Sequence, residues 1–184
     1  PMEIAEVASM AMELFSMDHW ESFFDKPEDL KKAKAHQLER VITIFPWIAI
    51  IDKFQHWIYQ HPTHTVEERY SEWMKIIKEF GTGEVDYSGF EAAQKRGWQG
   101  QLHLYEVPFY YVEYGFAQLG AIAVWRNYKQ NPTKALEQYK AALTLGYTKT
   151  IPEIYKTAGI KFDFSEAYIK DLMEFVVSEY DKVK

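Results

Sequence analysis

The sequence predicts an all-α protein, and three observations favour this fold class. Hydrophobic residues make up 47% of the 184 residues and aromatic residues 17%, which is enough to bury a sizeable core. Apolar residues recur at helical spacing along most of the chain, whereas the alternating pattern of strands is absent. Residues that start and stop helices divide the chain into segments. We therefore expect residues 1–184 to form a single helical bundle.

Three helices are predicted in the first half of the chain. The first two span about residues 3–17 and 27–60. Pro46 lies inside the second and should kink or divide it, because proline removes a helical hydrogen bond. Thr65-Val-Glu-Glu68 is a capping box that opens the third helix, which should end at Gly81. Beyond it, the irregular residues 84–95 predict a surface loop with a short turn.

Four further helices are predicted in the second half. An apolar helix should begin at Pro108, because proline suits a first helical turn, and extend to about Trp125. Asn131-Pro132 should cap and start the next helix, which ends at Gly146. Two more are expected at about residues 150–159 and from residue 165 or 166 to the C-terminus, the former opened by a Thr-x-x-Glu pattern.

Charge and composition exclude several classes of partner. The formal net charge is −6 and no long basic run occurs, so we expect no nucleic-acid partner. The longest apolar run is interrupted by Glu113 and Gln118, so we expect a buried helix and no membrane partner. Without cysteine, any metal must be held by His, Asp or Glu. The lack of cysteine and of a recognisable leader favours a cytoplasmic location.

The segment Gln101–Trp125 is the most informative part of the chain. It places His103 and several tyrosines at the mouth of a helix that is otherwise apolar. Phenols donate hydrogen bonds without carrying charge, and histidine donates or accepts near neutral pH. Such groups can hold a peptide or stabilise an oxyanion, although aromatic residues at helical spacing are more often core. The small residues of this segment, such as Gly120, should let a second element approach closely.

An acidic face is predicted on the first helix. Glu6, Ser9 and Glu13 share this face with Met10, so it is either a solvated stripe or the site of a buried ligand. One glutamate cannot bind a catalytic zinc, which needs three protein ligands and an open position. None of the six histidines forms a His-Glu-x-x-His motif.

Two segments together resemble the oligoendopeptidase F branch of the thimet-oligopeptidase-like zinc peptidases. They are Glu6–Glu13 and His103–Tyr114, and the resemblance extends from Glu3 to about Tyr180. It implies that Glu6 is the third zinc ligand and that Ser9 and Glu13 help to hold Glu6 without binding the metal themselves. It further implies roles for a histidine and four tyrosines: His103, Tyr111 and Tyr114 as catalytic contacts to the reacting carbonyl, and Tyr105 and Tyr110 as substrate-binding residues.

The sequence departs from this family pattern in one respect. The zinc-binding His-Glu-x-x-His helix, with its general-base glutamate, does not occur in these 184 residues. The resemblance therefore implies the C-terminal portion of a larger zincin-type α-helical catalytic domain, with the N-terminal part of the same protein as its partner.

Zinc and short unfolded peptides are then the expected cofactor and substrates of the intact enzyme. The isolated chain is expected to be inactive and not to retain zinc. The alternatives are a stand-alone helical module that binds a peptide or partner helix without catalysis, and a purely structural bundle.

Overall fold

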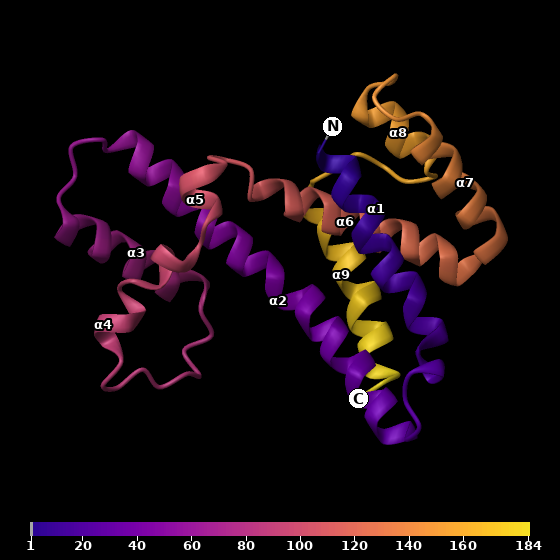
Figure 1. Cartoon of the computed structure of the whole chain (residues 1–184), viewed down its shortest axis with the longest axis horizontal. Coiled ribbons are helices and arrows are strands. Elements are labelled where there is room, and N and C mark those ends of the chain that lie inside the picture. Colours follow the sequence, from indigo (N-terminus) through magenta and orange to yellow (C-terminus); the bar gives the residue numbers. More distant parts are fainter. Residues whose placement is uncertain (1) are drawn as a thin grey trace. The chain divides into compact units, whose positions relative to one another are not determined.

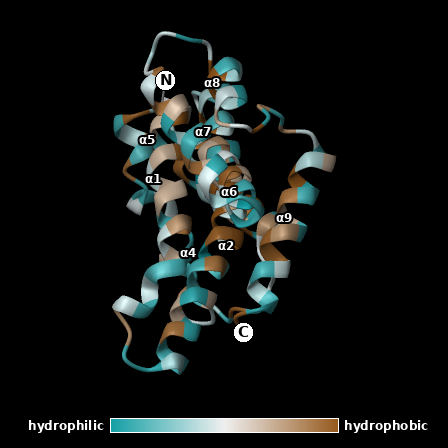
Figure 2. Ribbon diagram, turned by 90° about the vertical axis from the view of Figure 1, so that its right-hand side faces the viewer, coloured by the Kyte–Doolittle hydropathy of each residue, from teal (hydrophilic) through white to brown (hydrophobic). Residues whose placement is uncertain are grey.

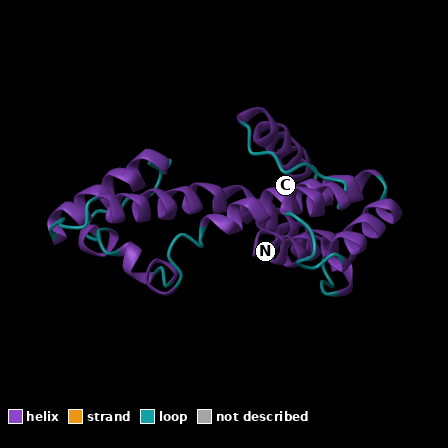
Figure 3. Ribbon diagram, turned by 90° about the horizontal axis from the view of Figure 1, so that it is seen from above, coloured by secondary structure: helices purple, strands orange, loops and turns teal. Residues whose placement is uncertain are grey.

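The computed structural model describes residues 2–184, with the side chains from Ile4 onward, and consists of helices joined by turns and loops (Figure 3). No strand occurs among these residues, which confirms the all-α fold class. The elements, in order, are α1 (Met2–Ser16), η1 (Met17–Ser22), α2 (Pro27–Gln60), α3 (Val66–Phe80), α4 (Glu91–Gln94), η2 (Gly97–Gly100), α5 (His103–Glu106), α6 (Val112–Gln130), α7 (Pro132–Thr144), α8 (Ile151–Thr157) and α9 (Glu166–Asp181). None of the helices within residues 2–184 has the length and apolar character needed to cross a membrane.

The predicted helix starts are largely confirmed. At α3, the Thr65 hydroxyl accepts the backbone N–H of Glu68 at 3.2 Å, and the Glu68 carboxylate accepts the N–H of Thr65 at 2.7 Å. At α7, the Asn131 side chain accepts the N–H of Lys134 at 3.1 Å. These caps form because a short polar side chain satisfies the N–H groups that a first helical turn leaves unpaired.

Two expectations about prolines are wrong in part. Pro46 does not divide α2, which continues from Pro27 to Gln60. The apolar helix α6 begins at Val112 rather than at Pro108. The reason is Phe109, whose φ of 62° is left-handed and cannot continue into a right-handed helix.

The chain divides into two compact units, which are described separately. The first unit comprises Pro1–Ile42 and Glu113–Lys184, and the second comprises Thr43–Val112. The expectation of a single unit over residues 1–184 stays a prediction.

The first unit is built around α6. The middle of this helix, from Ala117 to Trp125, is buried. A Cβ on Gly120 would lie 2.9 Å from Cγ2 of Val7 and 3.0 Å from the hydroxyl of Tyr155, so glycine is what lets α1 and α8 approach α6. This confirms the expected close approach at that position. The α9 helix mixes hydrophobic and hydrophilic residues along its length (Figure 2), and its buried residues are Leu172 and Val176.

The second unit has a separate core, in which α3 packs beside the C-terminal half of α2 (Figure 1). The buried residues of this core are Ile50, Ile51, Phe54, Trp73, Ile76 and Trp98. The indole of Trp73 donates a hydrogen bond to the carbonyl oxygen of Gln94 at 2.9 Å, which fixes the segment after α3 against the core. The site residues that lie in this unit follow directly after that segment.

Candidate functional site

In the first unit, α1 and the start of α6 place Glu6 close enough to Tyr114 for their charges to interact. Both side chains are half-buried. Burial raises the pKa of the Tyr114 phenol above its ordinary value, and the negative charge of Glu6 raises it further. A phenol is protonated at neutral pH in any case, so Tyr114 can donate a hydrogen bond, and its neighbours shift its titration further away from neutral pH.

The other two polar residues of the acidic face are exposed. The hydroxyl oxygen of Ser9 lies 3.2 Å from Oε2 of Glu6 and 3.0 Å from the carbonyl oxygen of the same residue, and its single proton is shared between these acceptors. Oε2 of Glu13 accepts a hydrogen bond from Nε2 of Gln37 at 3.1 Å, which links α1 to α2. The face thus combines a half-buried carboxylate, oriented by a hydroxyl, with solvated neighbours.

In the second unit, His103 lies within a cluster of aromatic rings. Its ring meets the edge of Tyr111 at a centroid distance of 4.8 Å, and it stacks at 17° on Tyr110 at 6.4 Å. Three of the residues that the sequence singled out are therefore gathered in one place. Their rings are half-buried, so they combine contact with the protein and access to solvent.

Tyr105 makes a different ring contact. Its ring stacks on that of Trp98 at a centroid distance of 6.2 Å. Burial raises the pKa of the Tyr105 phenol, and the nearby Arg69 guanidinium opposes this by lowering it. Arg69 itself lies over the ring of Trp98 at 5.4 Å. A substrate-binding role for Tyr105 stays a prediction.

A strained turn positions Tyr110 and Tyr111. The backbone N–H of Phe109 donates to Oε1 of Gln55 at 2.9 Å, and Gln55 is only 2% exposed. The Phe109 ring packs against His56 at 4.9 Å and Tyr59 at 4.8 Å, both on α2. A left-handed φ at a bulky residue persists only where surrounding contacts impose it. Gln55 and its neighbours on α2 therefore fix the backbone at Phe109 and, with it, the position of Tyr110 and Tyr111, which follow directly in the chain.

Sequence reasoning missed the residues that hold this cluster. Gln55 belongs to no motif and lies among polar residues such as Asp52, Lys53 and His56, so its burial is not visible in the sequence. Gln101 and Trp47 belong to no motif either. The indole of Trp47 donates to Oε1 of Gln101 at 3.3 Å, and Nε2 of Gln101 lies 2.6 Å from Nδ1 of His103. The sequence carries no local signal for these three residues, because the contacts of Gln55 and Trp47 join positions 54 apart.

The eight predicted site residues divide between the two units. Glu6, Ser9, Glu13 and Tyr114 lie in the first unit, and His103, Tyr105, Tyr110 and Tyr111 lie in the second. That all of them converge on one carbonyl group stays a prediction.

The chemistry of Glu6 fits one position of a zinc site. A half-buried carboxylate oriented by a hydroxyl is a suitable oxygen ligand for zinc. Within residues 2–184, no group of three or more His, Cys, Asp or Glu side chains is placed to hold a metal ion. Glu6 thus fits as one ligand of a site that needs two further protein ligands.

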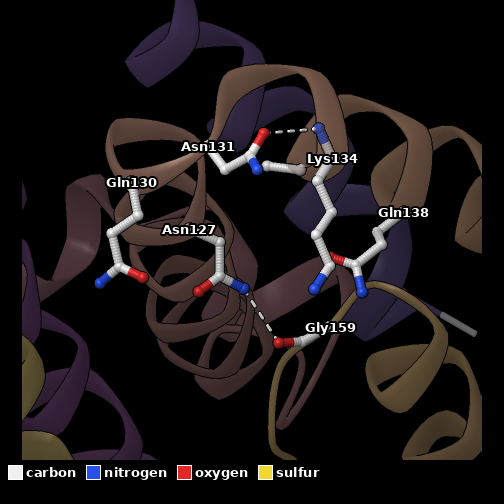
Figure 4. A pocket seen from close by; sticks show the side chains of 7 residues that line it. Asn127, Gln130, Asn131, Lys134, Gln138 and Gly159 are labelled. Carbon is white, nitrogen blue, oxygen red and sulfur yellow. Dashed lines mark hydrogen bonds between the residues drawn. The ribbon is translucent and has the colours of Figure 1, made fainter.

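A separate cleft of about 260 Å³ lies in the first unit between α6, α7 and Gly159 (Figure 4). Side-chain amides dominate its lining: Asn127, Gln130, Asn131 and Gln138, together with Lys134. Two of these amides have structural partners, since Asn127 donates to the carbonyl oxygen of Gly159 at 2.9 Å and Asn131 caps α7. Its lining includes none of the predicted site residues.

The sequence model of Peptidase family M3 matches residues 1–174, and the chain belongs to this family. No curated protein sequence matches the chain significantly.

Solved structures agree with this assignment. A structure of PZ peptidase A with an inhibitor is 27% identical, with a TM-score of 0.91, over 100% of this chain and 32% of that one. A protein provisionally described as oligoendopeptidase F is 29% identical, with a TM-score of 0.87, over 100% and 32%. Another, from Bacillus anthracis strain Ames, is 25% identical, with a TM-score of 0.79, over 99% and 29%. The chain thus spans about a third of their length.

Proposed function

We propose that this chain is part of a zinc metallopeptidase that hydrolyses internal bonds of short unfolded peptides. The observation that carries the proposal is the pairing of Glu6 with Tyr114, which places a carboxylate of the kind that binds zinc beside a phenol that can donate a hydrogen bond. Membership of Peptidase family M3, whose sequence model matches residues 1–174, supports the peptidase class. The roles of Glu6 and Tyr114 rest on the resemblance of their two segments to the oligoendopeptidase F branch. The similarity to proteins described as PZ peptidase A and oligoendopeptidase F supports it as well.

In this proposal Glu6 is the metal ligand of the chain. When bound, zinc polarises the scissile carbonyl and lowers the pKa of a bound water. Ser9 orients the Glu6 carboxylate through its hydroxyl, and Glu13 supports the same helix face through Gln37. The other zinc ligands and the general base would come from the N-terminal part of the same protein, which is the proposed partner. The proposed location is the cytoplasm.

The tyrosines and His103 act on the peptide. As negative charge develops on the carbonyl oxygen, the phenols of Tyr111 and Tyr114 and the imidazole of His103 donate hydrogen bonds to it. The Tyr114 phenol carries its proton at neutral pH and so has a donor for this bond. Tyr105 and Tyr110 position the peptide backbone. Removing one such donor typically lowers the rate on the order of 10²–10³-fold.

A second candidate is peptide binding without catalysis. It is favoured by a groove of about 780 Å³ in the second unit, between α3 and the loop that follows it. Apolar residues dominate the groove, among them Met74, Ile77, Val85 and Tyr87. A groove of this kind can hold an extended peptide or a helix by apolar burial alone. Cleavage of a bound peptide separates this function from the first.

The test is hydrolysis of an internally quenched fluorescent peptide. We expect no zinc-dependent cleavage by the 184-residue chain alone, and chelator-sensitive cleavage by the longer protein that also contains the N-terminal part. In that longer protein, Tyr114→Phe should lower kcat on the order of 10²–10³-fold. Tyr128→Phe is the matched control, because Tyr128 lies on the same helix and packs against Phe15 instead.

Two outcomes would contradict the proposal. Chelator-sensitive cleavage by the isolated chain would show that its metal site is complete without a partner. Equal kcat values for Tyr114→Phe and Tyr128→Phe would remove Tyr114 from the reaction. Peptide binding by the longer protein without any cleavage would favour the second candidate.

A further inference from the structure

A short chain of hydrogen bonds in the second unit ends at His103. The indole N–H of Trp47, on α2, points to Oε1 of Gln101 at 3.3 Å. On the other side of the same amide, Nε2 of Gln101 lies 2.6 Å from Nδ1 of His103. Trp47, Gln101 and His103 thus form a linear arrangement of one indole, one amide and one imidazole.

The indole determines the direction of both hydrogen bonds. An indole N–H can only donate, so the atom of Gln101 that faces it must be the amide oxygen. The amide NH₂ group then faces His103, and this group can only donate. Nδ1 of His103 must therefore accept, which places the proton of the neutral imidazole on Nε2. Rotating the amide by 180° would set two donors against each other at Trp47.

We propose that Gln101, held by Trp47, is a positioning residue that fixes neutral His103 as the tautomer protonated at Nε2. The imidazole of His103 packs against the rings of Tyr110 and Tyr111 at centroid distances of 6.4 Å and 4.8 Å. These contacts restrict the orientation of the imidazole ring. The amide sets the position of the proton and the tyrosines set the orientation of the ring.

The inference extends the proposed function and rests on it for its catalytic consequence. A neutral imidazole has one N–H, and only that nitrogen can donate to a carbonyl oxygen. With Nδ1 occupied by Gln101, the donor is Nε2. The opposite tautomer would place the donor at Nδ1, against the amide, and leave an acceptor at Nε2. Gln101 therefore decides whether His103 can assist at all.

The tautomer can be measured directly by ¹⁵N NMR of the histidine-labelled 184-residue chain, at a pH where histidine is neutral. His103→Gln assigns the resonances, because it removes one of the six histidines. We expect Nδ1 of His103 to have the chemical shift of an unprotonated nitrogen and Nε2 that of a protonated one. Protonation at Nδ1 in the unmodified chain would overturn the inference without need of any variant.

Substitutions at Gln101 test the cause. In Gln101→Glu the carboxylate can only accept, so the proton should move from Nε2 to Nδ1. In Trp47→Phe the amide loses its orienting donor, so both tautomers should be populated. Gln99→Glu is the matched control, because it adds the same charge at an exposed position two residues away and should leave the tautomer unchanged. An unchanged Nε2 tautomer in Gln101→Glu would overturn the inference.

Turnover in the longer protein separates this inference from the proposed function. At a pH where His103 is neutral in both proteins, Gln101→Glu should lower kcat on the order of 10²-fold or more with little change in KM, because a donor to the developing charge is lost. A tautomer that switches in Gln101→Glu while kcat stays the same would confirm the inference and remove His103 from the reaction. A merely structural role for Gln101 predicts a lower stability with the same tautomer.

Discussion

Gly120→Ala tests the packing that holds α1, and with it Glu6, against α6. The added Cβ would lie 2.9 Å from Cγ2 of Val7 and 3.0 Å from the hydroxyl of Tyr155. The contact with Val7 is too short for a real methyl group and the contact with Tyr155 is unusually tight, so the Val7 side chain, α1 or α8 must shift. Both neighbours belong to well-packed elements, since Val7 is 3% and Tyr155 is 1% exposed.

The expected change in stability is the difference of two terms. Overpacking a core by one carbon typically costs about 1–3 kcal/mol. Alanine favours a helix interior over glycine by about 1 kcal/mol, which offsets part of that cost. The net loss in the free energy of unfolding for Gly120→Ala should therefore be about 0–2 kcal/mol, with a midpoint of about 1 kcal/mol.

The assay is urea unfolding followed by far-UV circular dichroism, with Val7→Ala as the second arm of a double-mutant cycle. Removing the Val7 methyl groups makes room for the new one, so Gly120→Ala should cost less in that background, with a coupling of about 0.5 kcal/mol or more. If Gly120→Ala instead stabilises the chain by about 1 kcal/mol in both backgrounds, only the higher helix propensity of alanine affects stability. This result would refute the close approach of α1 and α8 to α6 at Gly120.

The remaining predictions concern single contacts. Glu6→Gln should lower the pKa of Tyr114, because it removes a charge that raises it, and ¹³C NMR of labelled tyrosine would show an unchanged pKa if the two residues do not interact. The backbone N–H of Thr65 and, to a smaller extent, its hydroxyl hold the pKa of Glu68 below its ordinary value, so Thr65→Ala, which removes only the hydroxyl, should raise that pKa part of the way back. A group whose pKa is lowered in the folded state stabilises the fold at pH values above its unfolded-state pKa, and this stabilisation is lost as the pH falls through the folded-state pKa. The difference in free energy of unfolding between Thr65→Ala and the unmodified chain should therefore shrink in acid. A difference that does not depend on pH would contradict this prediction. Gln55→Met should lower the free energy of unfolding in urea by about 0.5–1.5 kcal/mol, because the backbone N–H of Phe109 loses its acceptor, and an unchanged free energy of unfolding would contradict the role of Gln55 in holding this turn.

Two of these variants, Glu6→Gln and Gln55→Met, have a matched control in the chain. Glu13→Gln controls for Glu6→Gln, because Glu13 lies on the same helix face but bonds to Gln37. Gln60→Met controls for Gln55→Met, because Gln60 is exposed at the end of the same helix. Both controls should change the measured quantity far less than their partners.

The parts of the fold that the sequence predicted correctly depend on local interactions. The caps at Thr65 and Asn131 join residues three apart, so their pattern is visible in the sequence. The start of α6 was misplaced because Phe109 is held by Gln55, a residue 54 positions earlier. Nothing around Pro108 in the sequence reveals that contact. Pro46 does not divide α2, which keeps buried residues such as Ile51 and Phe54 just beyond it.

In the site, too, the residues of local motifs were predicted from the sequence and the residues that hold them through long-range contacts were not. The motif positions His103, Tyr110 and Tyr111 were found from the sequence and lie together in the second unit. Trp47 and Gln101 were not found, because a hydrogen bond across 54 positions follows no spacing rule. The catalytic, substrate-binding and metal-binding roles themselves stay predictions.

The central claim is that Glu6 binds zinc and that Glu13 only supports it. The most direct test is the zinc content and peptide turnover of Glu6→Gln and Glu13→Gln in the longer protein. Glu6→Gln removes an anionic ligand oxygen, so zinc content and turnover should fall together. Glu13→Gln should be milder, with a loss of roughly 10–100-fold at most in metal affinity or activity. Unchanged zinc content and turnover in Glu6→Gln would contradict the account and return this face of α1 to a solvated acidic stripe.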